Sequence, residues 1–425
     1  MSTDAAAIRD AVAALEDAAR ERLAALVRAD SRLGQEQAAQ RLMADWFGEL
    51  GLDVRRVPVD IEAIRDRPGF SPPLIDYAER ENVVGVHAPA NPRGRSLILN
   101  GHIDVVPPGP ERLWTDPPFE PVVRDGRMYG RGAGDMKAGL VAYSVAFEAL
   151  RSLAVAPAAP VYLQSVVEEE CTGNGALACL AADYTADAAI IPEPFAQQLM
   201  VAQVGVMWAR VTVSGRPSHV LDTGAGVNAI DAAHRLCTHL HTLVERWNAP
   251  DLRHPAWQGH PHPLNFNLGR IEGGDWTSTV PPEAVVDVRV GFFPGMELHD
   301  VRRAIEQAVD EALASDPALA GARAEVEWRG FQAEGAEMDP AHPMMSLLSE
   351  IHQQVAGSPI EHLASTATTD ARFFQLYGDT PATCYGPEAD AIHGIDESVS
   401  LASMMQVATV LALFMAEWCG LERAA

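Results

Sequence analysis

The sequence contains few cysteines and no paired cysteine motif. Its five cysteines are odd in number and scattered along the chain, at Cys171, Cys179, Cys237, Cys384 and Cys419. No two of them are spaced as C-x-x-C, the arrangement typical of structural zinc sites and redox-active pairs. The cysteine content therefore argues against a disulfide framework and against a zinc knuckle as the basis of the fold.

Long apolar runs and a secretion signal are also missing. No apolar run approaches the length of about 20 residues that spans a bilayer. Residues 1–27 alternate charge with alanine, as an amphipathic helix does, and lack the basic start and apolar block of a signal peptide. We expect a cytoplasmic protein that has no membrane partner.

Basic residues are scarce relative to acidic ones. Lys and Arg total 32 against 58 Asp and Glu, which gives a formal net charge of −26. Nucleic acids and anionic membranes repel such a chain, so neither is an expected partner. The hydrophobic content of 48% is that of an ordinary globular protein, and acidity alone does not indicate a reaction.

The length and the order of apolar patterns predict more than one domain. A chain of 425 residues exceeds the usual size of a single hydrophobic core. In the first half, strand-like runs alternate with helical stretches, which is typical of an α/β sheet layered by helices. The expected strands cover residues 83–87, 96–100, 161–167 and 188–191, and the expected helices cover residues 137–153 and 174–184.

A different order of elements begins near Val206. We expect a strand, a helix, two strands, a helix and a strand, at residues 206–215, 228–247, 266–271, 284–293, 297–315 and 324–330. This βαββαβ order is that of a ferredoxin-like unit. We therefore predict an inserted domain at residues 207–330 and a discontinuous catalytic domain formed by residues 1–206 and 331–425. Residues 330–343 would be the return linker, and residues 400–419 a closing amphipathic helix.

Five segments place an acidic or histidine side chain at the end of an apolar run. They are GHIDVV, GRGAGDMKAG, VVEEECTG, IIPEP and IHGIDE, and their candidate ligands are His102, Asp135, Glu170, Glu193 and His393. Functional residues gather at the carboxyl ends of strands in such sheets, so distance along the chain need not mean distance in space. Two imidazoles and three carboxylates suit a pair of divalent metal ions.

Each motif alone also has a structural interpretation. His102 could be a half-buried strand histidine bonded to a neighbouring acid, and Asp135 could cap a helix. The glycine-rich segment before Asp135 lacks the spacing of a phosphate-binding loop. The three glutamates at 168–170 could form a solvated acidic turn, and His393 could be an ordinary loop histidine. Only convergence of the five segments would distinguish a metal centre from these alternatives.

Two further acids have expected roles beside the ligands. Successive side chains at a strand end point in opposite directions, so Glu170 can face the metals while Glu169 reaches a bound water as general base. Asp104 lies two residues after His102, and its carboxylate can fix the tautomer of that imidazole.

The wording and order of the five segments resemble those of the zinc-dependent superfamily of aminoacylases, acetylornithine deacetylases, succinyl-diaminopimelate desuccinylases and glutamate carboxypeptidases. The resemblance spans nearly the whole chain. It implies one ion held by His102 and Glu193, a second held by Glu170 and His393, and Asp135 as a bridge between them. It also implies Glu169 as general base and Asp104 as the residue that orients His102.

The same resemblance extends to the insert and to possible substrate contacts. GRPSHV resembles a lid motif whose histidine, here His219, stabilises the oxyanion in the active site of a partner subunit. The stretch GGDWTSTVPPEAVVDVRV keeps an arginine, Arg289, which the resemblance makes an expected substrate contact, but it has Ser278 where many relatives have asparagine. TTDARF resembles a segment near the pocket and makes Thr369 and Arg372 expected substrate contacts; an arginine suits a carboxylate.

The resemblance implies an α/β, zinc-peptidase-like catalytic domain with a mixed sheet flanked by helices, and a ferredoxin-like lid that mediates homodimerisation. We expect a metal-dependent amidohydrolase, of deacetylase, desuccinylase or deformylase type, that removes an acyl group from a small N-acylated amino acid or amine. Zinc is the expected metal, with cobalt and manganese as alternatives. The segments EEECTGNG and WTSTVP resemble a subgroup that includes formylaminopyrimidine deformylases. The alternatives are a metallo-dipeptidase or glutamate carboxypeptidase and, from another class, a catalytically silent ligand-binding or scaffold protein.

Overall fold

The larger lobe is built on a six-stranded mixed sheet. The computed structural model describes residues 4–424. The strand order is β1-β2-β7-β3-β8-β16, and the four strands from β7 to β16 are parallel. Their bounds are β1 (Asp53–Pro58), β2 (Glu81–His87), β7 (Val161–Val166), β3 (Leu97–His102), β8 (Ala189–Ile191) and β16 (Ala382–Cys384). All six residues of β3 are buried, as expected for a parallel strand covered on both faces.

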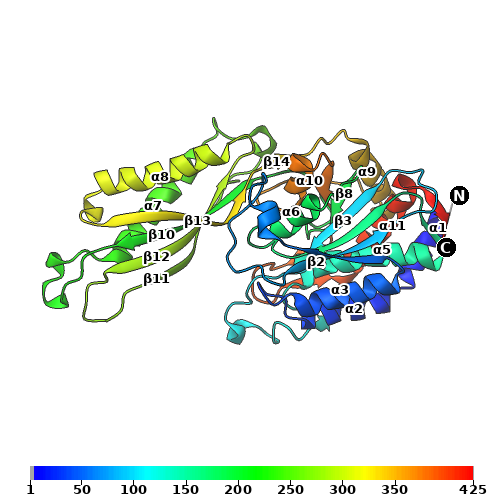
Figure 1. The fold of residues 1–425 in the computed structure, drawn as a ribbon, viewed down its shortest axis with the longest axis horizontal. Coiled ribbons are helices and arrows are strands. Elements are labelled where there is room, and N and C mark those ends of the chain that lie inside the picture. The colour runs from blue at the N-terminus through cyan, green and yellow to red at the C-terminus, as the bar shows by residue number, and fades with distance from the viewer. Residues whose placement is uncertain (1–3, 425) are drawn as a thin grey trace.

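Helices cover both faces of this sheet (Figure 1). α3 (Gln37–Glu49) and α5 (Ala138–Ser152) lie on one side, and α6 (Asn174–Ala181) and α10 (Ala371–Tyr377) lie on the other. The remaining helices of this lobe are α1 (Ala5–Ala13), α2 (Glu16–Arg28), α4 (Ile61–Ile64), α9 (Pro343–Ala356) and α11 (Leu401–Trp418). The single amphipathic helix expected over residues 1–27 is thus two helices, and residues 1–3 lie outside the described part of the chain.

Short strands form three smaller sheets around the larger one. A four-stranded sheet joins β17 (Ala389–Asp390), β18 (Ser398–Ser400), β5 (Arg127–Tyr129) and β4 (Val122–Arg124). β14 (Ala336–Glu337), β9 (Leu199–Gln203) and β15 (His362–Ser365) form a second sheet, and β19 (Leu421–Arg423) pairs with β6 (Val155–Pro157). The expected linker at residues 330–343 is therefore partly strand.

The closing helix α11 differs from the amphipathic helix that the sequence predicted. Its 18 residues have a mean hydropathy of 1.4, so by length and composition it could cross a membrane. The prediction that no apolar run approaches the length of a membrane span is therefore wrong for this helix. In the structure 61% of this segment is buried, and α11 packs on α5 and α9. A core helix of this kind is apolar around most of its circumference because protein surrounds it.

The smaller lobe extends away from the larger one (Figure 1). It consists of β10 (Gly205–Ser214), α7 (Ala229–Trp247), β11 (Phe266–Gly273), β12 (Glu283–Phe292), α8 (Leu298–Ser315) and β13 (Arg323–Ala333), in that order. The strands form an antiparallel sheet of order β11-β12-β10-β13. Val211 and Val286 are buried between the sheet and the two helices, whereas their neighbours along each strand are only half-buried.

Buried apolar side chains form two main clusters. One consists of residues from the six-stranded sheet and its helices, and the other consists mainly of residues from β10, β12, α7 and α8. The chain passes from the first cluster to the second near Ala202 and returns near Ala336. This division places the carboxyl edge of the parallel strands beside the sheet of the smaller lobe.

Candidate metal centre

The parallel strands bring the predicted ligands to one edge of the sheet. His102 is the last residue of β3, and β7 and β8 are its neighbours on either side. Glu169 and Glu170 follow the end of β7, and Glu193 follows the end of β8. The described structure therefore brings residues from three strand ends together, as the carboxyl-edge argument predicted.

Asp135 lies between the two predicted histidine ligands. It belongs to the turn of residues Ala133–Lys137 that leads into α5, whereas His393 belongs to the loop between β17 and β18. Asp135 Oδ1 is 3.1 Å from His102 Nε2, and Asp135 Oδ2 is 3.3 Å from His393 Nε2. Each carboxylate oxygen thus faces a different imidazole, which is the arrangement required of a ligand shared by two ions.

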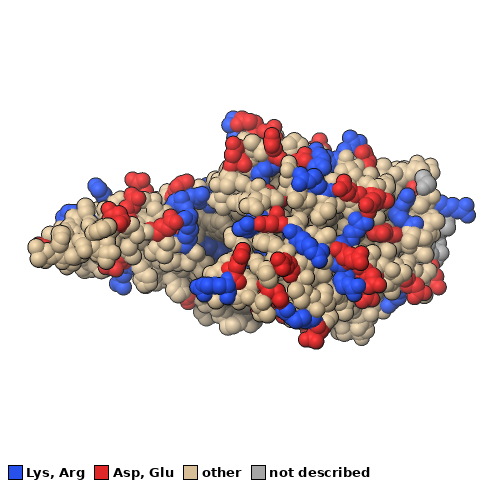
Figure 2. Space-filling view, turned by 90° about the horizontal axis from the view of Figure 1, so that it is seen from below, with Lys and Arg blue, Asp and Glu red and all other residues tan. Residues whose placement is uncertain are grey.

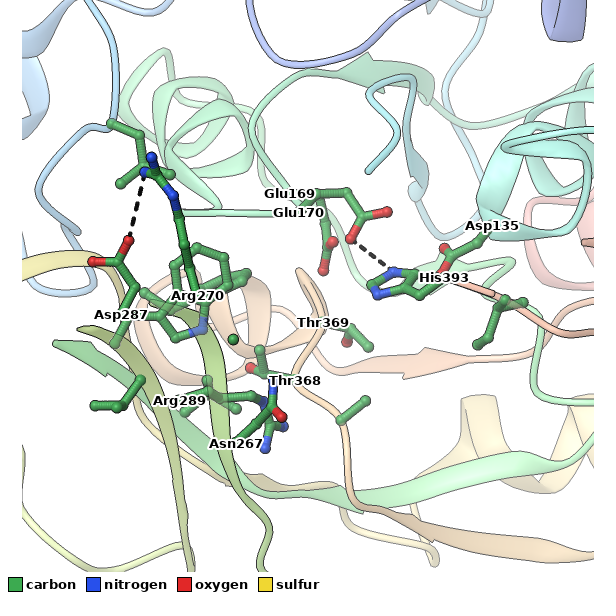
Figure 3. A pocket seen from close by; sticks show the side chains of 18 of the residues that line it. Asp135, Glu169, Glu170, Asn267, Arg270, Asp287, Arg289, Thr368, Thr369 and His393 are labelled. Atoms are coloured by element: carbon green, nitrogen blue, oxygen red, sulfur yellow. Dashed lines mark ion pairs between the residues drawn. The ribbon is translucent and has the colours of Figure 1, made fainter. Parts of the chain in front are cut away.

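The remaining carboxylates complete the two ends of this arrangement. His393 Nε2 is 3.0 Å from Glu170 Oε2, and a dashed line marks this ion pair in Figure 3. At the other end, Glu193 Oε1 and Glu169 Oε2 are each 3.9 Å from His102 Nε2. His102 with Asp135 and Glu170, and His102 with Glu169 and Glu193, form two overlapping groups with the spacing of a metal site.

The electrostatics of the cluster favour the binding of cations. Burial raises the pKa of Glu169 and of Glu193 well above the usual carboxylate range. Burial opposes protonation of His102, but Asp135 and the nearby glutamates raise its pKa above the usual value. Among the described residues, the buried Oε1 of Glu170 has no hydrogen-bond partner. A buried carboxylate oxygen without a donor, among other acids, is suited to a metal ion.

Asp104 contacts His102 by a different route from the predicted one. The backbone oxygen of Asp104 is 2.9 Å from His102 Nδ1, whereas its carboxylate is 3.8 Å away. That carboxylate instead accepts hydrogen bonds from the backbone N–H groups of Glu169, at 3.3 Å, and Glu170, at 3.1 Å. The prediction assumed an extended strand through Asp104, but β3 ends at His102. Asp104 therefore holds the turn that carries the two glutamates.

Glu397 is a buried residue that the sequence interpretation missed. Its carboxylate accepts hydrogen bonds from the backbone N–H groups of Gly132, Gly134 and Asp135, at 2.9–3.0 Å. Arg131 Nη1 pairs with the same carboxylate at 2.5 Å, and both side chains are 1% exposed. The only signal in the sequence was the last acid of IHGIDE, and nothing indicated that it would turn inward. Glu397 holds the turn that carries Asp135.

Replacing Glu397 by glutamine is expected to lower the free energy of unfolding by about 3 kcal/mol, because Arg131 would remain as a buried cation without its partner. We also expect metal affinity to fall about 10- to 100-fold, as when a group that orients a metal ligand is changed. Urea denaturation and metal titration measure the two effects. The control is Glu388→Gln, at a half-exposed partner of Arg127; equal losses in both variants would contradict the prediction.

Lys137 anchors the other end of the same turn. It is the single lysine of the sequence, and it is fully buried. Its Nζ donates hydrogen bonds to the backbone oxygens of Leu26, at 2.8 Å, and Ala29, at 3.0 Å, at the end of α2. Burial lowers the pKa of this amine to about 7. A cation at the carboxyl end of a helix is favourably placed.

A cavity of about 630 Å³ lies between the cluster and the smaller lobe. Asp135, Glu169, Glu170, Glu193 and His393 line one end of it. Of the predicted substrate contacts, Arg289 and Thr369 also line this cavity. Arg289 donates hydrogen bonds to the backbone oxygens of Thr366, at 3.2 Å, and Asn265, at 3.3 Å. Arg289 and Thr369 both lie where they can contact a bound molecule (Figure 3).

Arg372 is buried and does not line the cavity in the described structure, so its contact with substrate stays a prediction without support from the cavity lining. Its side chain is 1% exposed and donates a hydrogen bond to the backbone oxygen of Thr172 at 2.9 Å. Its guanidinium lies 3.8 Å from the centre of the Phe373 ring. The side chain lies in the first turn of α10 and joins that helix to the loop before α6.

His219 and Ser278 lie in an exposed part of the smaller lobe. His219 forms a bridge with Thr279, and its Nδ1 accepts a hydrogen bond from the backbone of Leu221 at 3.0 Å. Neither residue lines the cavity of its own chain. The expectation that His219 acts in a partner subunit stays a prediction.

Comparison with known proteins places this centre in a family. Residues 98–417 match the model of Peptidase family M20/M25/M40, which is 320 of the 425 residues. The chain belongs to this family. N-formyl-4-amino-5-aminomethyl-2-methylpyrimidine deformylase of Halalkalibacterium halodurans is 28% identical over 350 residues, covering 78% of this chain and 81% of the relative. Acetylornithine deacetylase of Yersinia pseudotuberculosis is 32% identical over 289 residues, covering 66% and 68%.

Two solved structures share the fold of this chain over nearly its whole length. The dipeptidase Dug1p of Saccharomyces cerevisiae has a TM-score of 0.80 at 15% identity and 99% coverage of both chains. Human carnosine dipeptidase 1 has a TM-score of 0.78 at 15% identity, covering 98% of this chain and 99% of that one. The mixed α/β architecture is therefore shared with these two solved structures.

Proposed function

We propose that this protein is a dinuclear zinc amidohydrolase that removes an acyl group from a small N-acylated amino acid or amine. The observation that carries the proposal is the position of Asp135, whose two oxygens face His102 at 3.1 Å and His393 at 3.3 Å. Relatives named as a deformylase and as acetylornithine deacetylases support the acyl-transfer chemistry. Cobalt and manganese are alternative metals.

The proposed ligand set follows the two ends of the cluster. His102 and Glu193 would hold one ion, Glu170 and His393 the other, and Asp135 both. When bound, such a pair lowers the pKa of a water molecule and stabilises developing negative charge on an oxygen. Glu170 and Glu193 are mostly buried, so bulk water would screen the interaction of a bound cation with their carboxylates only weakly.

Glu169 is the proposed general base. It lines the cavity beside the ligands, and its raised pKa in the buried site suits a group that both takes and returns a proton. It would take a proton from the attacking water and give that proton to the nitrogen of the scissile amide. The carbon–nitrogen bond then breaks, leaving a carboxylate and a free amine.

The smaller lobe would act as a lid. We propose a ferredoxin-like lid and dimerisation domain at residues 207–330, inserted into a catalytic domain of residues 1–206 and 331–425. Because His219 lies outside the cavity of its own chain, its proposed oxyanion role requires a homodimer in which it reaches the neighbouring subunit. We further propose a cytoplasmic location, without a nucleic acid or membrane partner.

Removing the metal is expected to abolish turnover, because the bound ions are what would activate the attacking water. The purified protein is treated with a chelator, then supplied separately with zinc, cobalt or manganese, and elemental analysis counts the ions in each chain. We expect about two ions per chain and recovery of activity.

The substrate panel compares N-acetyl, N-formyl and N-succinyl compounds with dipeptides and with peptides ending in glutamate. Preference for the acylated compounds supports the proposal, and preference for peptides would favour the peptidase alternative. Full activity of metal-free protein would contradict the metal mechanism. Absence of any turnover by metal-loaded protein would favour the scaffold alternative.

A further inference from the structure

The two ends of the cavity carry opposite charge. Four carboxylates line the end formed by the metal cluster: Asp135, Glu169, Glu170 and Glu193. The lid sheet contributes four arginines and one acid to the other end: Arg210, Arg270, Arg289, Arg329 and Asp287. The lid end therefore has a formal charge of +3, from four positive groups and one negative group. In a chain of net charge −26, this concentration of basic groups is not a background property of the surface.

Strand alternation explains why these side chains share one face. Ala209 and Val211 of β10 are buried against the helices of the lid, so Trp208 and Arg210 point to the opposite face. Asp287 on β12 pairs in register with Arg210 and also with Arg270 on β11, where the strand has a bulge. Figure 2 shows basic side chains along the lid side of the hollow between the lobes.

One ion pair accounts for only part of this cluster. Arg210 donates two hydrogen bonds to Asp287, at 2.7 and 2.8 Å, which is an ordinary cross-strand pair. Arg270 is 3.9 Å from the same carboxylate, and its other partner, Glu272, is exposed. The hydrogen bond from Arg210, with weaker contributions from Arg329 and Arg270, lowers the pKa of Asp287. Two arginines thus approach this carboxylate within 4.0 Å, and Arg329 lies farther from it in the same cavity.

Two cavity arginines lack any acidic partner. Within residues 4–424, neither Arg289 nor Arg329 has a carboxylate oxygen within 4.0 Å. Arg289 bonds to two backbone oxygens instead. A structural role in the sheet explains Arg210, but it does not explain why Arg329 faces the cavity with no partner. An anion from outside the chain would supply the missing charge.

Apolar groups line the cavity beside these arginines. Trp208 and Phe331 pack edge to face, with ring centres 5.2 Å apart, and both line the cavity. Trp208 Nε1 is buried without a hydrogen-bond partner among the described residues. An apolar wall with a few polar groups at its ends is typical of a small-molecule site.

We propose that Arg329, together with Arg210 and Arg270 around Asp287, forms an anion subsite on the lid, separate from Arg289. This inference rests on the proposed amidohydrolase function and narrows its substrate class. The substrate would be an N-acyl compound that carries an acidic group, carboxylate or phosphate, on the part farthest from the scissile amide. The guanidinium fork matches both kinds of group. The carbon skeleton would lie against Trp208 and Phe331.

The test compares substrates that differ chiefly in the charge of the tail. Metal-loaded enzyme is assayed with N-acetyl-L-glutamate against N-acetyl-L-glutamine, and with N-acetyl-O-phospho-L-serine against N-acetyl-L-serine. We expect kcat/KM to favour the acidic member of at least one pair by about tenfold or more, the usual worth of a hydrogen bond to a charged group. The pair that shows the preference identifies the carboxylate or the phosphate.

Variants then locate the preference on the lid. Arg329→Gln is expected to reduce the ratio of acidic to neutral kcat/KM about tenfold, mainly through KM of the acidic substrate. Asp287→Asn is expected to increase that ratio, because it removes the carboxylate that competes for the three arginines. The control is Arg303→Gln on α8, an exposed lid arginine outside the cavity, which should leave the ratio and the basal activity unchanged.

The outcomes separate this inference from the proposed function. Equal turnover of acidic and neutral members in both pairs, or an unchanged ratio in both Arg329→Gln and Asp287→Asn, would overturn the subsite while leaving the amidohydrolase proposal intact. If metal-loaded wild-type enzyme hydrolysed no acylated compound, the proposed function would fail and the subsite with it.

Discussion

Replacing Glu169 by glutamine is expected to lower kcat about 10³-fold, within the usual range for loss of a general base. Glutamine keeps the shape of the side chain and leaves intact the backbone hydrogen bond from residue 169 to Asp104. It cannot accept a proton from water or return one to the leaving nitrogen. Because Glu169 is not among the proposed ligands, the variant should still bind about two metal ions per chain.

The variant Glu170→Gln serves as the comparison for Glu169→Gln. Glu170→Gln alters a side chain whose Oε2 lies 3.0 Å from His393 and whose Oε1 has no other partner in the described structure. This variant should lose metal as well as activity. Elemental analysis and steady-state assays of both variants separate the two roles. Full activity of metal-loaded Glu169→Gln would exclude the proposed base.

Replacing Asp135 by alanine is expected to have the largest effect on metal content. The substitution removes both oxygens that face His102 and His393, so neither proposed ion keeps its full ligand set. Changes to groups that merely orient a ligand reduce affinity or activity by about 10- to 100-fold, and loss of a shared ligand should exceed that range. Elemental analysis after dialysis and an assay at saturating zinc measure the two losses.

Asp390→Ala is the matched control for that experiment. Asp390 lies three residues before His393, is 69% exposed and pairs with Arg127. Its removal should leave metal content and activity near wild type, because exposed ion pairs contribute little. Two tightly bound ions in Asp135→Ala would be incompatible with a shared ligand.

The sequence predicted the strand ends of the site because a buried strand is recognisable from its apolar residues. β3, β7 and β8 are short and almost wholly buried, and the polar residues at or just after their last positions lie at the edge where parallel strands end. The predicted order of strands and helices over residues 206–330 matches the elements from β10 to β13 for a similar reason. Buried and less buried residues alternate along β10 and β12, which makes these strands recognisable in the sequence.

Other features depend on contacts that no local pattern records. Arg372 has the residue type of a carboxylate-binding side chain, yet the packing of α10 directs it to the backbone of Thr172. Glu397 is an acid in a loop, and only the fold brings it to the turn before α5. α11 was expected to be amphipathic, but it is largely apolar and is mostly buried against α5 and α9. In each case, partners distant in the chain determine the environment.

The position of Lys137 gives this protein an unusual chemical property. Its amine is the only lysine amine in the chain and lies enclosed against the end of α2. Reagents that acylate lysines, including common cross-linkers and fluorescent esters, would have no side-chain target on the native surface. Labelling of this residue would therefore report that the contact between the end of α2 and the Asp135 turn has opened, and its rate would measure how often that opening occurs.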